Sequence, residues 1–236
     1  MKVSVLTPTA NRTKWFPLAV ECMKRQTWFE LGHEIEWIIV EDGEEDIRSL
    51  LMDLPKGVEI RYTRLEGKHP IGHKRNVCLD NANTPILVFW DDDDYYHPEY
   101  IQHMVTPLVS QFAYGVVGSP QLYSYNNGSI YLKGKYGNHS PCGVLGLTAK
   151  AIRQYEMRFN DEDTHGEERT FLKDFCVPIL VTDPRKTIIA IQHGENTWNV
   201  SFENDTPIPN RSLPDWAEAL VKKQSGFLSS GEINGE

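Results

Sequence analysis

Residues 86–100 read ILVFWDDDDYYHPEY, an apolar run that leads directly into four acidic residues. Five apolar residues, 86–90, predict a buried strand, and four aspartates, residues 91–94, follow it directly. Carboxylates held side by side repel one another and raise one another's pKa. A soluble protein tolerates that cost where a cation lies among them, and hard cations such as Mg²⁺ and Mn²⁺ select carboxylate oxygens. The stretch therefore favours a divalent-cation site, with a solvated acidic loop or a carboxylate-rich helix start as the alternative.

Strands and helices alternate on both sides of this stretch. Strands are predicted at residues 3–7, 35–40, 58–62 and 86–90, and helices at residues 46–52, 71–81 and 98–111. One more helix is predicted to run to about Gln26, with Asn11 or Thr13 as its cap and Pro17 in its first turn. This alternation is typical of an α/β protein with a doubly wound, mostly parallel sheet flanked by helices.

Polar residues follow three of these strands at the point where each strand ends. They are residues 7–9 (Thr-Pro-Thr), residues 41–43 (Glu-Asp-Gly) and the aspartates of residues 91–94. Ligands of open α/β sheets bind outside the carboxyl ends of the strands, so one shared site is expected there. Residues 72–76 (GHKRN) add a basic helix start, which suits a diphosphate, although a charged helix face is the alternative.

The second half of the chain is less regular. Strands are predicted at residues 116–119, 121–125, 129–133 and 188–192, and helices at 148–155, 167–175 and 215–223. Asn127-Gly128 indicates a hairpin between two of the strands, and His193 follows the last of them. We expect a single domain over residues 1–204, with a regular first half at about 1–97 and a less regular second half at about 98–204. Residues 205–236 form a C-terminal extension that is expected to be partly flexible.

Composition narrows the class of protein. The chain has 236 residues, 24 Lys and Arg against 33 Asp and Glu, and a formal charge of −9, so general nucleic-acid binding is not expected. No apolar run approaches the roughly 18 residues of a membrane span, and the N-terminus has no signal-peptide pattern. The four cysteines show no CxxC spacing and are expected to be free thiols. These features favour a cytoplasmic protein.

Six short motifs occur in order along the chain. They are TPTANR at residues 7–12, QT at 26–27, EDG at 41–43, KRN at 74–76, DDD at 91–93 and GEE at 166–168. In this order the chain resembles the GT-A glycosyltransferases, and most closely glycosyltransferase family 2, from Val3 to about Asn199. The resemblance implies a GT-A, Rossmann-like fold over residues 1–204, with a nucleotide-binding half at about 1–97 and an acceptor-binding half at about 98–204. It also implies transfer of a sugar from a nucleotide-diphosphate sugar, with UDP as the commonest carrier, to a carbohydrate or other hydroxyl acceptor.

The resemblance also implies a role for each motif residue. The aspartates would hold Mn²⁺ or Mg²⁺ across the diphosphate, and a late histidine completes the metal shell in many GT-A enzymes. The nucleotide and diphosphate would contact Thr7, Pro8, Thr9, Asn11, Arg12, Asp42, Lys74, Arg75, Asp91 and Asp92; the metal ligands would be Asp93, His193 and Asp91; and the catalytic base would be Glu168. The family usually has Asp at the position of Glu168, Glu167 is its competitor, and Asp161, Glu162 and Asp163 are the next candidates.

Two questions stay open at the level of the sequence. The acceptor is expected to contact residues 120–147, where the aromatic side chains suit sugar stacking or simple packing; they are Tyr123, Tyr125, Tyr131, Tyr136 and His139. The rival functions are a metal-dependent nucleotidyltransferase or phosphohydrolase and a non-catalytic sugar- or Ca²⁺-binding module. The first strand lacks the glycine-rich basic loop typical of nucleotidyltransferases, and the presence of Asp93, Glu168 and His193 argues against a module without activity.

Overall fold

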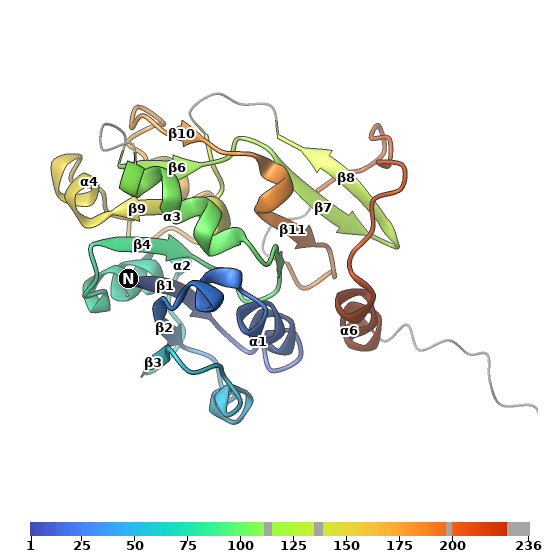
Figure 1. Cartoon of the computed structure of the whole chain (residues 1–236), viewed down its shortest axis with the longest axis horizontal. Coiled ribbons are helices and arrows are strands. Elements are labelled where there is room, and N and C mark those ends of the chain that lie inside the picture. The colour runs from blue at the N-terminus through green and yellow to red at the C-terminus, as the bar shows by residue number, and fades with distance from the viewer. Residues whose placement is uncertain (111–114, 135–138, 197–199, 226–236) are drawn as a thin grey trace, which may run out of the picture.

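The computed structural model describes residues 1–110, 115–134, 139–196 and 200–225. Its centre is a seven-stranded sheet in the order β10-β6-β9-β4-β1-β2-β3 (Figure 1). The strands are β1 (Lys2–Thr9), β2 (Glu34–Glu41), β3 (Val58–Arg64), β4 (Ile86–Phe89), β6 (Val116–Gly118), β9 (Leu145–Thr148) and β10 (Leu180–Val181). Strands β1 to β4 are parallel, and β9 runs antiparallel to both β4 and β6. The expected mostly parallel, mixed α/β sheet is confirmed.

The register of the parallel strands explains why their polar ends meet. Thr9 of β1 pairs with Glu41 of β2, and Leu6 of β1 pairs with Phe89 of β4. The residues that follow β2 and β4 therefore leave the sheet beside the end of β1. Apolar side chains bury both faces of these central strands, as is usual for parallel strands covered by helices.

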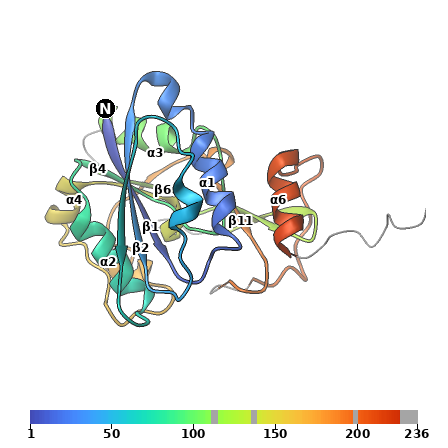
Figure 2. The ribbon, with the colours of Figure 1, turned by 90° about the horizontal axis from the view of Figure 1, so that it is seen from below.

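Helices cover both faces of the sheet. Residues of α1 (Phe16–Lys24) and α3 (Tyr100–Ser110) share one apolar core with Val5 and Trp37. Residues of α2 (Ile71–Asn81), α4 (Ala149–Gln154) and α5 (Glu168–Phe171) share the opposite core with Leu6 and Phe89. Figure 2 shows this layering, with α1 on one side of the sheet and α2 and α4 on the other.

A second, four-stranded sheet carries the late histidine. Its order is β5-β11-β7-β8, and its strands are β5 (Tyr95–Tyr96), β7 (Leu122–Asn126), β8 (Ser129–Lys133) and β11 (Ile188–Ile191). Strand β5 directly follows the aspartates and pairs antiparallel with β11, Tyr95 opposite Ile189. This pairing brings the end of β11 next to the aspartates. The hairpin predicted at Asn127-Gly128 joins β7 and β8, and both turn residues have positive φ.

Three local predictions were wrong. Neither Asn11 nor Thr13 caps α1: the cap position is Trp15, and the Asn11 side chain accepts from the backbone N of Glu44 instead. The helix predicted at 167–175 is only α5, because residues 173–175 take positive φ and end it. The helix predicted at 46–52 is a 3₁₀ turn, Arg48–Leu51. The remaining 3₁₀ turns are Thr27–Leu31, Cys142–Val144 and Pro184–Lys186.

The C-terminal helix α6 (Asp215–Ser225) packs beside α1. The Trp216 ring lies 4.4 Å from the Arg25 guanidinium carbon and 5.9 Å from the Tyr95 ring. Residues 226–236, expected to be flexible, lie outside the described residues, as do residues 111–114 at the end of the helix predicted at 98–111. All four cysteines are free, as expected. Among the described residues, no helix is both long and apolar enough to cross a membrane.

Candidate active site

The four aspartates lie beside two arginines, and each carboxylate has a different environment. Arg12 Nη2 lies 3.4 Å from Asp93 Oδ2, and Arg12 Nε lies 3.8 Å from Asp92 Oδ1. Arg75 Nη2 donates to Asp91 Oδ1 at 3.0 Å. Asp94 Oδ1 accepts from the backbone N of Ile191 at 2.9 Å, which ties it to β11. Asp94 therefore joins the two sheets, while the other three carboxylates remain at the sheet edge.

Burial and mutual repulsion raise the pKa of several of these carboxyl groups. Burial and then the charge of Asp93 raise the pKa of Asp92 to about 7. Burial, followed by the charges of Asp93 and Asp91, raises the pKa of Asp94 well above its usual range. The pKa of Asp91 is also raised by burial, although Arg75 opposes the shift. The raised pKa values show that these carboxylates lack enough positive charge around them. A bound divalent cation would supply that charge.

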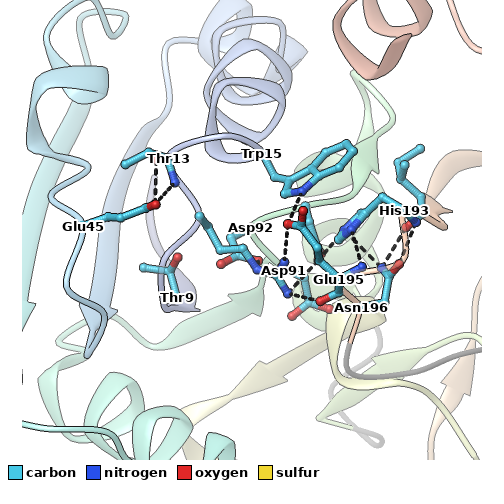
Figure 3. A network of polar contacts seen from close by, with 12 residues as sticks. Thr9, Thr13, Trp15, Glu45, Asp91, Asp92, His193, Glu195 and Asn196 are labelled. Carbon is cyan, nitrogen blue, oxygen red and sulfur yellow. Dashed lines mark hydrogen bonds and ion pairs between the residues drawn. The ribbon is translucent and has the colours of Figure 1, made fainter. Parts of the chain in front are cut away.

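His193 lies against Asp93. Its Nε2 is 3.0 Å from Asp93 Oδ2, and its ring stacks on the Trp15 indole with 3.9 Å between centroids and 20° between planes (Figure 3). Its Nδ1 accepts from the backbone N of Glu195 at 3.2 Å, and Asn196 Nδ2 lies 3.2 Å from its Nε2. A metal ion would bind at Nε2, the ring nitrogen that faces Asp93.

Two residues at this edge of the sheet offer ligand atoms that suit a divalent cation. Carboxylate and imidazole are ligands that Mn²⁺ takes, and Asp93 Oδ2 and His193 Nε2 face each other at 3.0 Å. Asp91 is engaged by Arg75 instead. Within the described ranges, three converging ligand atoms of His, Cys, Asp or Glu occur only at Cys142, Glu167 and Glu168, and Arg75 links Glu167 to Asp91. Asp93 and His193 are therefore the pair of residues that best suits the metal.

A cavity of about 710 Å³ lies at the carboxyl ends of β1, β2 and β3. Its lining includes Asn11, Asp42 and Arg64. Asp42 is buried and anchored from both sides, since Lys74 Nζ donates to its Oδ1 at 2.8 Å and the backbone N of His69 to its Oδ2 at 2.6 Å. Lys74 Nζ therefore donates to Asp42 and also to the Thr9 carbonyl, at 3.2 Å.

The three residues that end β1 differ in what they face. Thr7 is fully buried, and its hydroxyl accepts from Trp37 Nε1 at 2.9 Å, which makes it part of the core. Pro8 is also buried. Thr9 lies next to Asp92, where its hydroxyl lowers the pKa of that carboxyl against the effect of burial (Figure 3). Of the three side chains, that of Thr9 borders the aspartates.

Arg75 connects the aspartates with the acidic pair at the start of α5. Its guanidinium is buried, with Nε 2.7 Å from Glu167 Oε1 and Nη2 3.0 Å from Asp91 Oδ1. It also lies over the Phe89 ring, 5.4 Å from the centroid. The side chain bridges two carboxylates that flank the sheet edge, and its contact with the diphosphate, expected from the sequence motif, stays a prediction.

The two neighbouring glutamates have opposite pKa shifts. Burial would raise the pKa of Glu167, but the Arg75 charge and hydrogen bonds, including one from the Cys142 thiol, hold it below the usual value. Burial raises the pKa of Glu168, and the charge of Glu167 adds to that. Glu168 Oε1 lies 3.8 Å from His139 Nε2. Glu167 is therefore a fixed anion, whereas Glu168 has the environment of a proton acceptor.

Of the other candidates for the base, Asp161 has its carboxylate held at the start of α2: Oδ1 accepts from Asn76 Nδ2 at 2.9 Å and lies 3.2 Å from His73 Nδ1. Asp163 Oδ1 accepts from Asn160 Nδ2 at 3.1 Å, and the Asp163 carbonyl accepts from the backbone N of Gly72 at 3.0 Å. Glu162 is exposed, and its backbone N donates to Asn160 Oδ1 at 3.2 Å.

The described tyrosines of residues 120–147 are packed against other side chains. Arg211 lies 3.5 Å from the Tyr123 ring centroid, Tyr125 hydroxyl donates to Glu218 at 3.4 Å, and the Tyr131 ring contacts Phe202 at 4.8 Å. Tyr136 lies outside the described residues. His139, beside Glu168, is the described member of the set that reaches the acidic pair.

Three residues near the site were missed by the sequence reasoning: Trp15, Cys142 and Glu195. The available signals were a Trp directly after Lys14 and close to Arg12, and an acidic residue two positions after His193. Cys142 carried none, because its contact with Glu167 depends on the fold.

A carboxylate-rich edge beside a cavity at the carboxyl ends of the strands is where open α/β sheets bind ligands. The model of glycosyl transferase family 2 matches residues 4–175, so the chain belongs to this family and is a glycosyltransferase. A glycosyltransferase of Rickettsia felis is 32% identical over 102 residues, which is 43% of this chain and 16% of that protein. The chain thus spans about a sixth of that relative's length.

Solved structures share the fold at low identity. TarS 1-349 of S. aureus superposes with a TM-score of 0.67 and 17% identity, over 81% of this chain and 60% of that one. The same fragment has been solved with UDP-GlcNAc. The mannosyltransferase PcManGT of Pyrobaculum calidifontis, solved with GDP-Man and Mn²⁺, has a TM-score of 0.58 and 13% identity, over 80% and 56%. The GT-A fold expected from the motifs is confirmed.

Proposed function

We propose that the chain transfers a sugar from a nucleotide-diphosphate sugar to an acceptor hydroxyl, with inversion at the anomeric carbon and dependence on Mn²⁺ or Mg²⁺. A UDP-sugar is the proposed donor, because the structurally similar TarS binds UDP-GlcNAc. The cavity with Asn11 and Asp42 is the proposed nucleotide site. In this proposal residues 1–97 form the donor half, residues 98–204 the acceptor half, and residues 205–236 an extension.

The observation that carries the proposal is that the pKa of Glu167 is lowered and the pKa of the adjacent Glu168 is raised. Glu167 pairs with Arg75 at 2.7 Å, which leaves Glu168 as the carboxylate of the two with a raised pKa. A general base needs a pKa nearer the operating pH than that of an ordinary glutamate. Asp93 and His193 provide the metal contacts on the other side of Arg75 and Asp91.

In the proposed reaction the acceptor hydroxyl attacks the anomeric carbon on the face opposite the diphosphate. Glu168 takes the hydroxyl proton as the new bond forms, which contributes roughly 10²–10⁴-fold to the rate. A divalent cation, when bound, neutralises the charge that develops on the leaving diphosphate. Arg12, which lies between Asp92 and Asp93, is positioned to contact the same phosphates. No protein acid is needed to protonate the leaving group.

Donor hydrolysis tests the proposal without knowledge of the acceptor. The purified chain is incubated with UDP-GlcNAc, UDP-glucose or GDP-mannose and Mn²⁺, and nucleotide release is followed. We expect slow release of nucleoside diphosphate from at least one donor, lost on addition of EDTA. Release of nucleoside monophosphate would instead indicate a phosphohydrolase, and metal-independent release would contradict the metal assignment.

A further inference from the structure

His193 and Asp93 come from different sheets, so their contact depends on what holds the two loops together. Asp93 follows β4 of the seven-stranded sheet, and His193 follows β11 of the four-stranded sheet. The loop after β11 is closed on itself, because Asn196 accepts from the backbone N of His193 at 2.7 Å and donates to the Ile191 carbonyl at 2.8 Å. These local bonds shape the loop but do not fasten it to the aspartates.

The Glu195 side chain supplies that fastening. Its Oε1 lies 3.0 Å from Lys14 Nζ, and its Oε2 accepts from Trp15 Nε1 at 3.0 Å (Figure 3). Arg12 Nη2 also donates to the Glu195 carbonyl at 3.0 Å. All three partners belong to the segment between β1 and α1. Glu195 therefore ties the histidine loop to the segment that faces the aspartates.

Trp15 contributes twice to the same arrangement. Its indole is fully buried, stacks on the His193 ring at 3.9 Å, and donates Nε1–H to Glu195. Glu195 in turn donates its backbone N–H to His193 Nδ1 at 3.2 Å. The ring plane is thus fixed by the indole, and the ring nitrogen that faces Asp93 is fixed by the backbone of Glu195.

We propose that Trp15 and Glu195 are positioning residues that hold the His193 imidazole over Asp93, the place assigned to the metal. This inference rests on the proposed function. Partners behind a ligating histidine orient its ring, and their loss typically lowers metal affinity about 10- to 100-fold. The competing explanation is that Glu195, whose side chain is half exposed, forms an ordinary surface ion pair of little consequence.

The test compares Glu195→Ala with Glu45→Ala, a matched control. Glu45 is also an exposed carboxylate that accepts two hydrogen bonds from the same segment, from Thr13 N at 3.0 Å and Thr13 Oγ1, but it does not contact His193 (Figure 3). Mn²⁺ affinity is measured by calorimetry in the presence of UDP. We expect Glu195→Ala to weaken Mn²⁺ binding about tenfold or more with little change in melting temperature, and Glu45→Ala to leave it unchanged.

Two further variants separate the contacts. Glu195→Gln keeps an acceptor for Trp15 Nε1 and should recover part of the affinity. Trp15→Phe keeps the stack and loses the donor, so combining it with Glu195→Ala should add less than the two separate losses. Glu195→Ala with wild-type Mn²⁺ affinity would overturn the proposal.

A metal-free measurement keeps this inference separate from the metal assignment. The ¹⁵N signals of the His193 ring report the surroundings of both ring nitrogens. Glu195→Ala keeps the backbone N–H that donates to Nδ1 but removes the side chain that ties the loop to Lys14 and Trp15, so we expect the signals to change in Glu195→Ala but not in Glu45→Ala. If wild type binds no Mn²⁺, the metal part of the proposed function fails, and the ring signals still decide the role of Glu195. Unchanged ring signals in Glu195→Ala would refute it.

Discussion

At the scale of single residues, two adjacent glutamates differ because one arginine reaches only the first. Arg75 contacts Glu167, and burial raises the pKa of Glu168. Glu168→Gln keeps the size and removes the basicity, so kcat should fall roughly 10²-fold or more while donor binding stays intact. Steady-state kinetics and UDP calorimetry measure the two quantities. A dead Glu167→Gln beside an active Glu168→Gln would move the base by one residue.

The raised pKa of Glu168 also predicts the acid side of the pH profile. A base works only when deprotonated, so activity should rise with pH through the pKa of Glu168. Because that pKa lies above the usual value of 4.5, the acid limb should lie at higher pH than an ordinary glutamate would give. The pH dependence of kcat/KM in wild type measures it. An acid limb that persists unchanged in the residual activity of Glu168→Gln would belong to another group.

At the scale of elements, periodicity predicted the long, regular segments and failed on the short ones. Helix α3, Tyr100–Ser110, lies within the predicted range 98–111, because its buried apolar residues recur at helical spacing. Strands β5 and β10 have two residues each, too few to show any period, and β9 overlaps the predicted helix at 148–155 by one residue. Helix α5 ends early because Lys173, Asp174 and Phe175 adopt positive φ. Their residue types do not predict such a backbone, which is usual for glycine.

The same limit applies to the site. The motif order predicted which residues gather at the sheet edge, since strand ends converge by topology. Pairings such as Lys74 with Asp42 and Arg75 with Glu167 were not predictable, because they join segments 32 and 92 residues apart through side chains alone.

Arg75 is the side chain that joins three elements, and its removal tests this role. It lies on α2 and pairs with Asp91 after β4 and with Glu167 before α5. Arg75→Ala leaves the buried Glu167 and the partly buried Asp91 without their arginine, so we expect a loss of about 3–5 kcal/mol in the free energy of unfolding. Urea denaturation measures it. Arg75→Ala with wild-type stability and a raised donor KM would assign Arg75 to the diphosphate alone.

At the scale of the whole molecule, the proposed metal lies where the two sheets meet, so its binding should stabilise the fold. Asp93 belongs to the edge of the first sheet and His193 to the end of β11 in the second. A ligand that binds only the folded chain at about 100 times its Kd adds about 2.7 kcal/mol. For a chain of this size that is about 5–11 °C in melting temperature, at about 2–4 °C per kcal/mol.

We therefore expect UDP with Mn²⁺ to raise the melting temperature by several degrees, and UDP with EDTA to raise it less. His193→Ala should lose the part of the shift that depends on Mn²⁺ and keep the part that UDP gives alone, because the nucleotide cavity lies at β1 to β3, away from β11. Differential scanning calorimetry of both proteins, without ligand, with UDP and EDTA, and with UDP and Mn²⁺, separates the two parts. An equal Mn²⁺-dependent shift in wild type and His193→Ala would show that the cation binds without His193.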